Sequence, residues 1–359
     1  MKEETDTLNE QAFIPHPSAL IPAVRRIAIM GAGGWGTALG LVAGRAGHSV
    51  RFWARSKAVV EAINRERVNS RYLAGHRLDG DVGATCEPGV ALREAEIVIL
   101  SAPSHATRAL LTRIAADLRP EMVLVSATKG IEIETGQRIS EVVRDVLGAA
   151  YGARFVCLSG PSFAQEVAAG QPTAVVAASA DGELSRGVQA ALSYANLRVY
   201  TNEDVAGTEL GGAVKNVVAV AAGMVSGLGL GANSIAALIT RGLAEIVRLA
   251  TAQGARLETL MGLAGLGDLV LTCTGGLSRN RYVGQELGRG RALADILAGM
   301  HEVAEGVRTT RAVRLLADRH GVEMPITAQV HAVLYEGRGV REAVEQLMAR
   351  PLKREFDPA

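Results

Sequence analysis

The chain has 359 residues, of which 48% are hydrophobic and 21% are charged, so it is long enough and apolar enough for two domains with full cores. Its 38 basic and 37 acidic side chains give a formal charge of +1, which argues against general electrostatic binding to nucleic acid or to an anionic membrane surface. Aromatic residues make up only 4%, so the stacking surface of single-stranded nucleic-acid binders is also missing.

Cysteine usage and the N-terminus indicate the compartment. Cys86, Cys157 and Cys273 lie far apart without a CxxC pair, so we expect reduced thiols rather than a disulfide framework. No histidine has metal-ligand spacing, and no metal is expected. Residues 1–24 are polar and then proline-rich, which predicts an N-terminal arm and not a secretory signal. The longest apolar run, 217–225, is nine residues, too short to span a bilayer, so we expect a soluble cytoplasmic protein without a membrane span.

Short β-rich runs dominate the chain from residue 25 to about residue 204. They are residues 26–30, 48–53, 96–101, 121–127, 155–159, 173–178 and 198–200, with helical patterns such as 37–46 and 135–147 between most of them. Several runs are apolar throughout, as in strands that are covered on both faces. The alternation predicts parallel strands in an open, doubly wound, Rossmann-like α/β sheet.

Strand patterns stop after about residue 204. A helical stripe at 234–253 is followed by helical segments at 282–287, 293–297, 303–319, 328–335 and 340–348. We therefore expect a dinucleotide-binding domain over 25–204 and an all-α domain over 205–359. No linker separates them, so a ligand cleft is expected at their interface. The sequence does not determine the oligomeric state, and a homodimer is one possibility.

A glycine-rich turn, Gly31-Ala32-Gly33-Gly34-Trp35-Gly36, follows the first predicted strand and opens a helix. In that context Gly31 makes the tight turn, Gly33 lets backbone N–H groups reach a pyrophosphate, and Gly36 lets the helix lie close to the sheet. The helix N-terminus adds partial positive charge. The motif predicts a dinucleotide site, the alternative being a tight turn without a ligand.

The end of the second predicted strand distinguishes the two dinucleotides. NAD-preferring folds place an Asp or Glu there, about 20 residues after the glycines, to bind the ribose 2′-hydroxyl. This chain has Trp53-Ala54-Arg55-Ser56-Lys57 instead, and an arginine suits a 2′-phosphate. NADP(H) is therefore favoured as the cofactor, with NAD(H) also open. The alternative for Arg55 is an ordinary surface charge.

Polar residues follow three further predicted strands, at Ser101-Ala102-Pro103, Thr128-Lys129-Gly130 and Gly160-Pro161-Ser162-Phe163. Ligands of doubly wound folds bind beyond the carboxyl ends of the strands. Lys129 and Ser162 are therefore placed to face a substrate, although each could instead be a loop residue in water.

Lys215 lies at the end of the segment 209–216, directly before the apolar run 217–225. Burial disfavours the charged form of a lysine and lowers its pKa toward the range of an acid or base catalyst. We therefore expect Lys215 to be catalytic. The alternative is a lysine at the helix rim that extends its ammonium into water.

Two further polar segments complete the candidate site, Gly265-Leu266-Gly267-Asp268-Leu269 and Ser278-Arg279-Asn280-Arg281. The second is a dense set of hydrogen-bond donors, in which Arg279 can bind a phosphate in a bidentate manner. It predicts a phosphate site, with a solvated polar loop as the alternative.

Together these motifs resemble the bacterial NAD(P)-dependent glycerol-3-phosphate dehydrogenase family. The resemblance spans residues 25–340 and rests on GAGGWG at 31–36, ATKG at 127–130, GPSFAQE at 160–166, ELGGAVKN at 209–216, ANSIAALITRGLAEIVRL at 232–249, GLAGLGDL at 262–269, TCTGGLSRNR at 272–281 and AEG at 304–306. It implies reversible hydride transfer between sn-glycerol 3-phosphate and NAD(P)⁺, giving dihydroxyacetone phosphate, and a role in phospholipid synthesis.

The resemblance also implies roles at matching positions. Lys215 matches the family's proton donor and acceptor at the substrate C2 oxygen. The other substrate contacts fall on Lys129, Gly160, Ser162, Asp268, Ser278, Arg279 and Asn280. Beside the glycines of the turn, nucleotide contacts fall on Gly34, Trp35, Arg55, Lys129, Ala164, Arg279, Val303 and Glu305. Two positions depart from the family: Gly34 stands where serine is frequent, and residues 301–306 differ from the usual run before the Glu-Gly pair.

Two other functions use a similar arrangement. A β-hydroxyacid or ketopantoate-type reductase also pairs a Rossmann domain with a helical one and uses lysine, but its substrates carry a carboxylate in place of a phosphate. A non-catalytic NADPH-binding sensor would not need both lysines and the Ser-Arg-Asn loop, all of which this chain retains.

Overall fold

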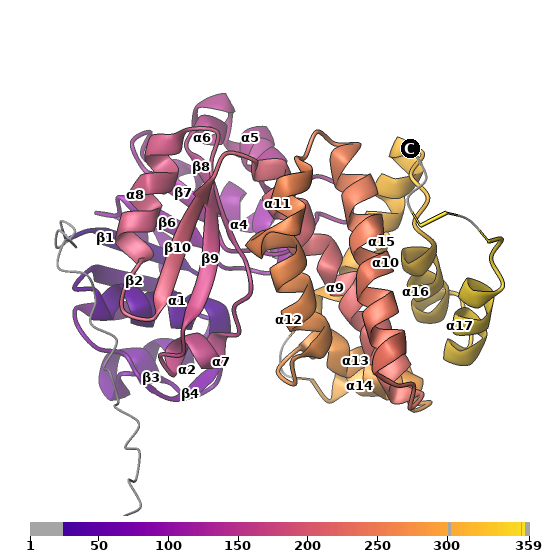
Figure 1. Cartoon of the computed structure of the whole chain (residues 1–359). Coiled ribbons are helices and arrows are strands. Elements are labelled where there is room, and N and C mark those ends of the chain that lie inside the picture. Colours follow the sequence, from indigo (N-terminus) through magenta and orange to yellow (C-terminus); the bar gives the residue numbers. More distant parts are fainter. Residues whose placement is uncertain (1–23, 301–302, 353, 356–359) are drawn as a thin grey trace, which may run out of the picture.

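The computed structural model describes residues 24–300, 303–352 and 354–355 (Figure 1). A sheet with helices on its faces forms the first half of the chain, and a group of packed helices forms the second half beside it. The predicted arm, 1–24, lies outside the described residues except for Val24. Because the helices and strands follow one another as the sequence pattern indicated, the Rossmann-like α/β fold with a helical second half is confirmed.

Eight strands form the main sheet, in the order β10-β9-β8-β7-β6-β1-β2-β5. Their bounds are β1 Arg26–Met30, β2 Ser49–Trp53, β5 Val82–Thr85, β6 Ile97–Leu100, β7 Val123–Ser126, β8 Phe155–Ser159, β9 Thr173–Ala178 and β10 Leu197–Asn202; a separate antiparallel pair joins β3 Val68–Asn69 and β4 Leu73–Arg77. The strands from β5 to β8 are parallel and have the Rossmann order. This order puts a topological switch point between β1 and β6, where ligands of such sheets bind.

Helices cover both faces of this sheet. They are α1 Gly34–Arg45, α2 Lys57–Glu61, η1 Ala62–Glu66, α3 Pro88–Leu92, α4 Ser104–Ile114, η2 Ala115–Asp117, α5 Ile139–Leu147, α6 Ala149–Ala153, α7 Ala164–Ala168 and α8 Gly182–Leu192. Ile27 and Ile29 of β1 belong to one apolar core, whereas Ala28 and Met30 belong to another. Successive side chains of a strand point to opposite faces, so both faces are buried, as the apolar runs predicted.

The prediction of a fully parallel sheet is wrong at one pair of strands. β8 and β9 pair antiparallel, with Leu158 opposite Ala177. The connection between them, residues 160–172, contains only the five-residue helix α7, which is too short to serve as a full crossover helix. The strands β3, β4 and β5 were also not predicted, because they are short and lack a continuous apolar run.

The second half contains only helices among the described residues. They are α9 Val205–Gly227, α10 Ala232–Thr251, α11 Leu257–Met261, η3 Leu263–Gly267, α12 Asp268–Thr274, α13 Arg279–Gly288, α14 Leu293–Ala298, α15 Glu305–His320, α16 Pro325–Tyr335 and α17 Val340–Met348. The predicted boundary at residues 204 and 205 stays a prediction, and it falls between β10 and α9.

Helix α9 is the central element of the helical half, and every residue from 207 to 225 is buried. By length and composition it is the one helix of the described residues that could cross a membrane, but 89% of its apolar window is buried inside the protein. It packs against α10, α12, α13 and α15, so it is the core helix of the helical half.

Glycines allow α9 and α13 to pack with their backbones in contact. A Cβ on Gly223 of α9 would overlap the Arg281 carbonyl oxygen, and a Cβ on Gly284 of α13 would overlap the Val220 carbonyl oxygen. Backbone atoms cannot move aside as the end of a long side chain can, so only glycine fits. This close contact places α13, and the polar loop before it, against α9.

We predict that Gly284→Ala lowers the free energy of unfolding by about 1–3 kcal/mol, because the methyl group would push the two helices apart. Urea unfolding measures the change. The control is Gly187→Ala on α8, where no atom lies within 4 Å of the added Cβ, and it should raise stability by about 0.5–1 kcal/mol. Equal effects of the two substitutions would show that α9 and α13 do not pack this closely.

Candidate active site

The glycine-rich turn lies at the switch point of the sheet and opens α1. Gly31 has a φ of +128°, and a Cβ on it would lie 2.9 Å from the Ser101 carbonyl oxygen at the end of β6. A Cβ on Gly36 would overlap the Gly31 carbonyl oxygen. Gly33, the N-cap of α1, has no atom within 4 Å of its Cβ position. The turn therefore packs tightly against the end of β6 at Gly31 and Gly36, whereas the space around Gly33 at the N-terminus of α1 is open. This arrangement fits the pyrophosphate of NAD(P).

Most of the predicted nucleotide residues lie around this turn. Gly34 and Trp35 form the first turn of α1, and Ala164 begins α7, which packs on α1. Arg55 is exposed directly after β2, the strand beside β1. Val303 is 38% exposed just before α15. Their roles toward the cofactor stay predictions.

Lys129, Lys215 and Asp268 form an ion cluster that joins the two halves of the chain. Asp268 has no exposed surface, and its two oxygens face different lysines. Lys129 Nζ donates to Asp268 Oδ2 at 2.8 Å, and Lys215 Nζ donates to Asp268 Oδ1 at 2.5 Å. Lys129 follows β7, whereas Lys215 lies on α9 and Asp268 begins α12. One buried carboxylate therefore holds an ammonium group from each half of the protein.

The loop after β8 continues this cluster. Lys129 Nζ also donates to the Gly160 carbonyl oxygen at 2.7 Å and lies 3.4 Å from Ser162 Oγ, which itself donates to the Gly160 oxygen at 2.9 Å. Gly160 has a φ of +130°, and this left-handed conformation turns the chain sharply after the strand. Residues that the sequence placed in separate motifs therefore meet in one connected group.

Lys215 has the electrostatic environment of an acid or base catalyst. Its side chain is almost fully buried, with 5% of the residue exposed. Burial lowers its pKa from 10.5 to about 8; the nearby Lys129 charge also lowers it, while the Asp268 carboxylate raises it. Both protonation states of Lys215, the ammonium and the neutral amine, are therefore populated at pH values near 8. The ammonium faces the ion cluster and not bulk solvent.

Two asparagines connect this cluster to α13 and α15. Asn216 Nδ2 lies 3.4 Å from the Lys129 carbonyl oxygen, and Asn216 Oδ1 accepts from Asn280 Nδ2 at 2.8 Å. Asn280 Oδ1 accepts from the Gly306 backbone N–H at 2.9 Å. Asn280, predicted to face a phosphate, is thus buried and engaged at both ends of its carboxamide. In this structure it links three helices.

The remaining predicted phosphate residues stand at the N-terminus of α13. Ser278 is the N-cap, and its Oγ accepts from the Arg281 backbone N–H at 3.2 Å. Arg279 is the first residue of the helix and is exposed. A helix N-terminus with an arginine beside it attracts phosphate through its backbone dipole and through the guanidinium charge.

Glu305 connects α15 to the switch point of the sheet. Its carboxylate accepts from the Ser104 backbone N–H at 3.2 Å and from Ser104 Oγ at 2.7 Å. Ser104 is the first residue of α4, which begins just after β6. The start of α15, with Val303 and Glu305, therefore lies against the edge of the sheet that carries the glycine-rich turn.

Sequence reasoning missed three polar residues of the site. Thr272 Oγ1 accepts from Lys215 Nζ at 2.7 Å and lies one helical turn after Asp268, a spacing that could have indicated it. Asn216 follows Lys215 directly. Asn69, only 1% exposed, donates through Nδ2 to the Ala32 carbonyl oxygen at 2.9 Å and to Thr37 Oγ1 at 2.8 Å. Nothing in the sequence links Asn69 to the glycine-rich turn that it holds.

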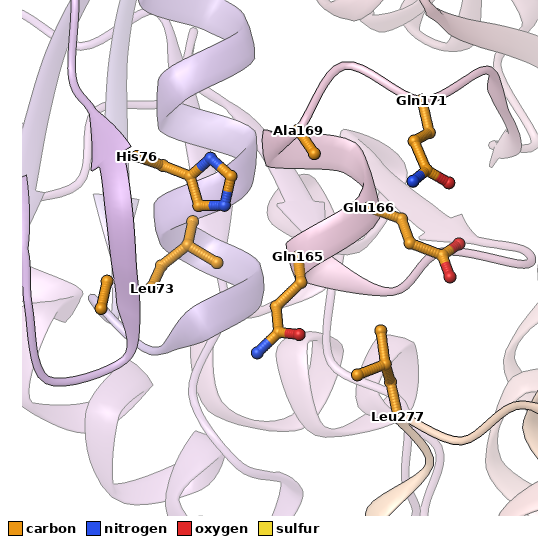
Figure 2. A pocket seen from close by; sticks show the side chains of 8 residues that line it. Leu73, His76, Gln165, Glu166, Ala169, Gln171 and Leu277 are labelled. Carbon is orange, nitrogen blue, oxygen red and sulfur yellow. The ribbon is translucent and has the colours of Figure 1, made fainter.

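A cavity of about 560 Å³ opens beside the site, between β4, α7 and the loop before α13. Figure 2 shows Leu73 and His76 on one side, Gln165 and Glu166 of α7 with Ala169 just after it on another, and Leu277 below. Leu277 immediately precedes Ser278, so the cavity lies near the start of α13. None of the lysines of the ion cluster lines it. Among the described residues, no group of three or more metal-ligating side chains is present.

Two sequence profiles together match most of the chain. The profile for the NAD-dependent glycerol-3-phosphate dehydrogenase N-terminus matches residues 26–185, and the profile for its C-terminus matches residues 204–345.

Two curated relatives and one solved structure are also glycerol-3-phosphate dehydrogenases. A glycerol-3-phosphate dehydrogenase [NAD(P)+] of Koribacter versatilis is 56% identical over 328 residues, which is 91% of this chain and 97% of the relative. One of Nitratidesulfovibrio vulgaris is 52% identical over 331 residues, 92% of this chain and 100% of the relative. The crystal structure of glycerol-3-phosphate dehydrogenase from Coxiella burnetii superposes with a TM-score of 0.87 at 41% identity, covering 91% of this chain and 99% of that one.

We predict that Asn69→Ala destabilises the protein by about 1–3 kcal/mol, because the buried Ala32 carbonyl and Thr37 hydroxyl lose their donor. It should also weaken NADPH binding, since the carboxamide holds the turn that fits the pyrophosphate. Urea unfolding and titration with NADPH measure the two effects. Asn233→Ala, at an exposed position of α10, is the control and should change neither. Unchanged NADPH affinity in Asn69→Ala would contradict the role in positioning the turn.

Proposed function

The chain belongs to the family of NAD-dependent glycerol-3-phosphate dehydrogenases, and we propose that Lys215 is the proton donor and acceptor of its reaction. That reaction is reversible hydride transfer between NAD(P)H and dihydroxyacetone phosphate, which gives sn-glycerol 3-phosphate. The observation that carries the proposal is the buried Lys129–Asp268–Lys215 cluster, which joins the two halves of the chain at the edge of the sheet.

Reduction of a ketone at C2 requires a proton for the developing alkoxide oxygen. Lys215, as the ammonium, donates this proton and stabilises the negative charge before the transfer. Lys129 adds a second positive charge, and Asp268 fixes both ammonium groups at 2.8 and 2.5 Å. The bound nicotinamide supplies the hydride. In the opposite direction Lys215, as the free amine, removes the proton from the C2 hydroxyl.

The substrate phosphate is held away from the reacting carbon. We assign it to Arg279 and Ser278 at the N-terminus of α13, where a guanidinium charge and the positive end of the helix dipole lie together. Asn280 contributes by holding α13 to α9 and α15 through Asn216 and Gly306. Binding the phosphate at a fixed position orients C2 toward Lys215, so the binding energy of the phosphate supports the chemistry at C2.

The cofactor is NAD or NADP. The turn 31–36 and the N-terminus of α1 would hold its pyrophosphate, as the fit of the glycines supports. We propose a preference for NADP, because the exposed residue after β2 is Arg55 and no acidic residue lies in the stretch 53–57 that follows β2.

We further propose that the enzyme works in the cytoplasm and supplies glycerol phosphate for phospholipid synthesis. Its three cysteines are free thiols, as expected in a reducing compartment. A homodimer stays a prediction. The alternatives of a keto-acid reductase and a non-catalytic sensor are not favoured, because both profiles and the relatives named above are glycerol-3-phosphate dehydrogenases.

We predict that the purified protein oxidises NADPH with dihydroxyacetone phosphate, and that Lys215→Ala lowers kcat by at least about 100-fold, because general acid catalysis contributes about 10²–10⁴-fold. Equilibrium titration should show NADPH affinity within about threefold of wild type, since Lys215 is assigned to the substrate oxygen. Equal loss of cofactor binding, or near-normal turnover, would contradict the role of Lys215.

The pH dependence should have opposite signs in the two directions. Reduction needs the ammonium of Lys215, whose pKa is about 8, so kcat/KM for dihydroxyacetone phosphate should fall as pH rises above about 8. Oxidation of glycerol 3-phosphate needs the amine and should become faster over the same interval. Initial rates between pH 7 and 10 measure both profiles. The same direction of change in both profiles would exclude a single acid–base group at Lys215.

A further inference from the structure

Two arginines and a histidine from three separate elements lie near the switch point, outside the ion cluster described above. Arg55 follows β2, His105 is the second residue of α4, and Arg308 lies on α15. All three are exposed. The resemblance to the family assigns a nucleotide contact to Arg55 but gives no role to His105 or Arg308.

The contacts of α15 explain how a residue of the helical half reaches this edge. Glu305 binds the backbone N–H and the hydroxyl of Ser104, the residue directly before His105. Arg308 lies three residues after Glu305, a spacing that puts both on one side of α15. Arg308 therefore lies on the side of α15 that faces the first turn of α4.

The electrostatics of His105 support the same arrangement. Burial lowers its pKa below 6.5; the charges of Arg308 and, more weakly, of Arg55 lower it too, while Glu305 and Glu134 raise it. The strand order gives the geometry: the ends of β2 and β6 lie on the two sides of β1, so Arg55 after β2 and His105 after β6 stand on either side of the glycine-rich turn.

Both arginines lack a direct partner among the described residues. In the part of the chain that the structure describes, Arg55 and Arg308 have no hydrogen bond and no ion pair. The carboxylate of Glu305 accepts its hydrogen bonds from Ser104, and Glu134 is exposed to water, so neither carboxylate binds one of the arginines. Positive charges that lie near one another repel, so the arrangement becomes more favourable when an anion lies between them.

We propose that Arg308 and His105 complete, with Arg55, the binding site for the adenosine 2′-phosphate of NADP(H). This inference rests on the proposed cofactor preference. The end of β2 is where a Rossmann fold places the ribose 2′ group, whereas the pyrophosphate lies at the N-terminus of α1. The 2′-phosphate carries up to two negative charges and three acceptor oxygens, which suit two guanidinium groups and an imidazole. The phosphate would then be held by both halves of the chain, and NADP binding would favour their association.

The test compares the affinities of NADPH and NADH by equilibrium titration of the protein in the absence of substrate. Arg308→Gln should weaken NADPH binding by about 10- to 100-fold, the effect of losing a charge-assisted hydrogen bond, and should change NADH binding by less than about twofold. Arg55→Gln should act in the same direction. The matched control is Arg314→Gln, on the same helix, where the exposed side chain pairs with Asp318, and both affinities should be unchanged.

Adenosine 2′,5′-bisphosphate and AMP provide a second probe that does not involve the nicotinamide. The first should lose affinity in Arg308→Gln, and AMP should not. Equal losses for NADPH and NADH, or an unchanged NADPH affinity in Arg308→Gln while Arg55→Gln weakens it, would overturn the role of the helical half. Wild-type protein that binds neither dinucleotide would instead refute the proposed function itself, and equal wild-type affinities for both would refute the 2′-phosphate site.

Discussion

A single buried carboxylate, that of Asp268, holds an ammonium group from each half of this protein. The two lysines carry two positive charges against one negative charge, so the buried cluster is electropositive at the place assigned to the substrate oxygen. Removing one partner from a buried ion pair typically costs about 3–5 kcal/mol, since the remaining charge has neither water nor a counter-ion. Neither the sheet nor the helical half alone contains this arrangement, and the site therefore exists only while the two are packed together.

Close backbone packing makes the shared carboxylate possible. A Cβ on Gly211 of α9 would lie 2.7 Å from the Ala264 carbonyl oxygen in η3, and one on Gly212 would lie 2.5 Å from Ser159 Oγ at the end of β8. The first turns of α9 thus contact both the segment that leads to Asp268 and the strand that leads to Gly160. Buried Glu209, on the same helix, accepts from the Ser140 backbone N–H at 2.8 Å and so binds the start of α5. Glycine and glutamate on one helix fix Lys215 relative to the sheet.

The fold was largely predictable because it follows from local patterns. The β-rich runs predicted every strand of the main sheet except β5. The helical stripe at 234–253 corresponds to α10. The antiparallel strand β9 could not be foreseen, since the direction of a strand depends on how the connection 160–172 packs. Within the site, the motifs identified Lys129, Lys215 and Asp268 but not their contact. The assignment of Asn280 to the substrate stays a prediction, but its hydrogen bonds to Asn216 and Gly306 could not be foreseen, because spacing along a helix does not reveal which side is buried.

The pKa of Lys215 tests the central claim most directly. The chain has only five lysines, at positions 2, 57, 129, 215 and 353, so the ¹³Cε signals of selectively labelled lysine can be resolved and followed by NMR as a function of pH. One signal, absent in Lys215→Arg, should titrate near pH 8, and its midpoint should move lower in Asp268→Asn because the ammonium loses its carboxylate partner. A Lys215 that titrates near 10.4 like a solvated lysine, or whose midpoint does not change in Asp268→Asn, would contradict the shared carboxylate.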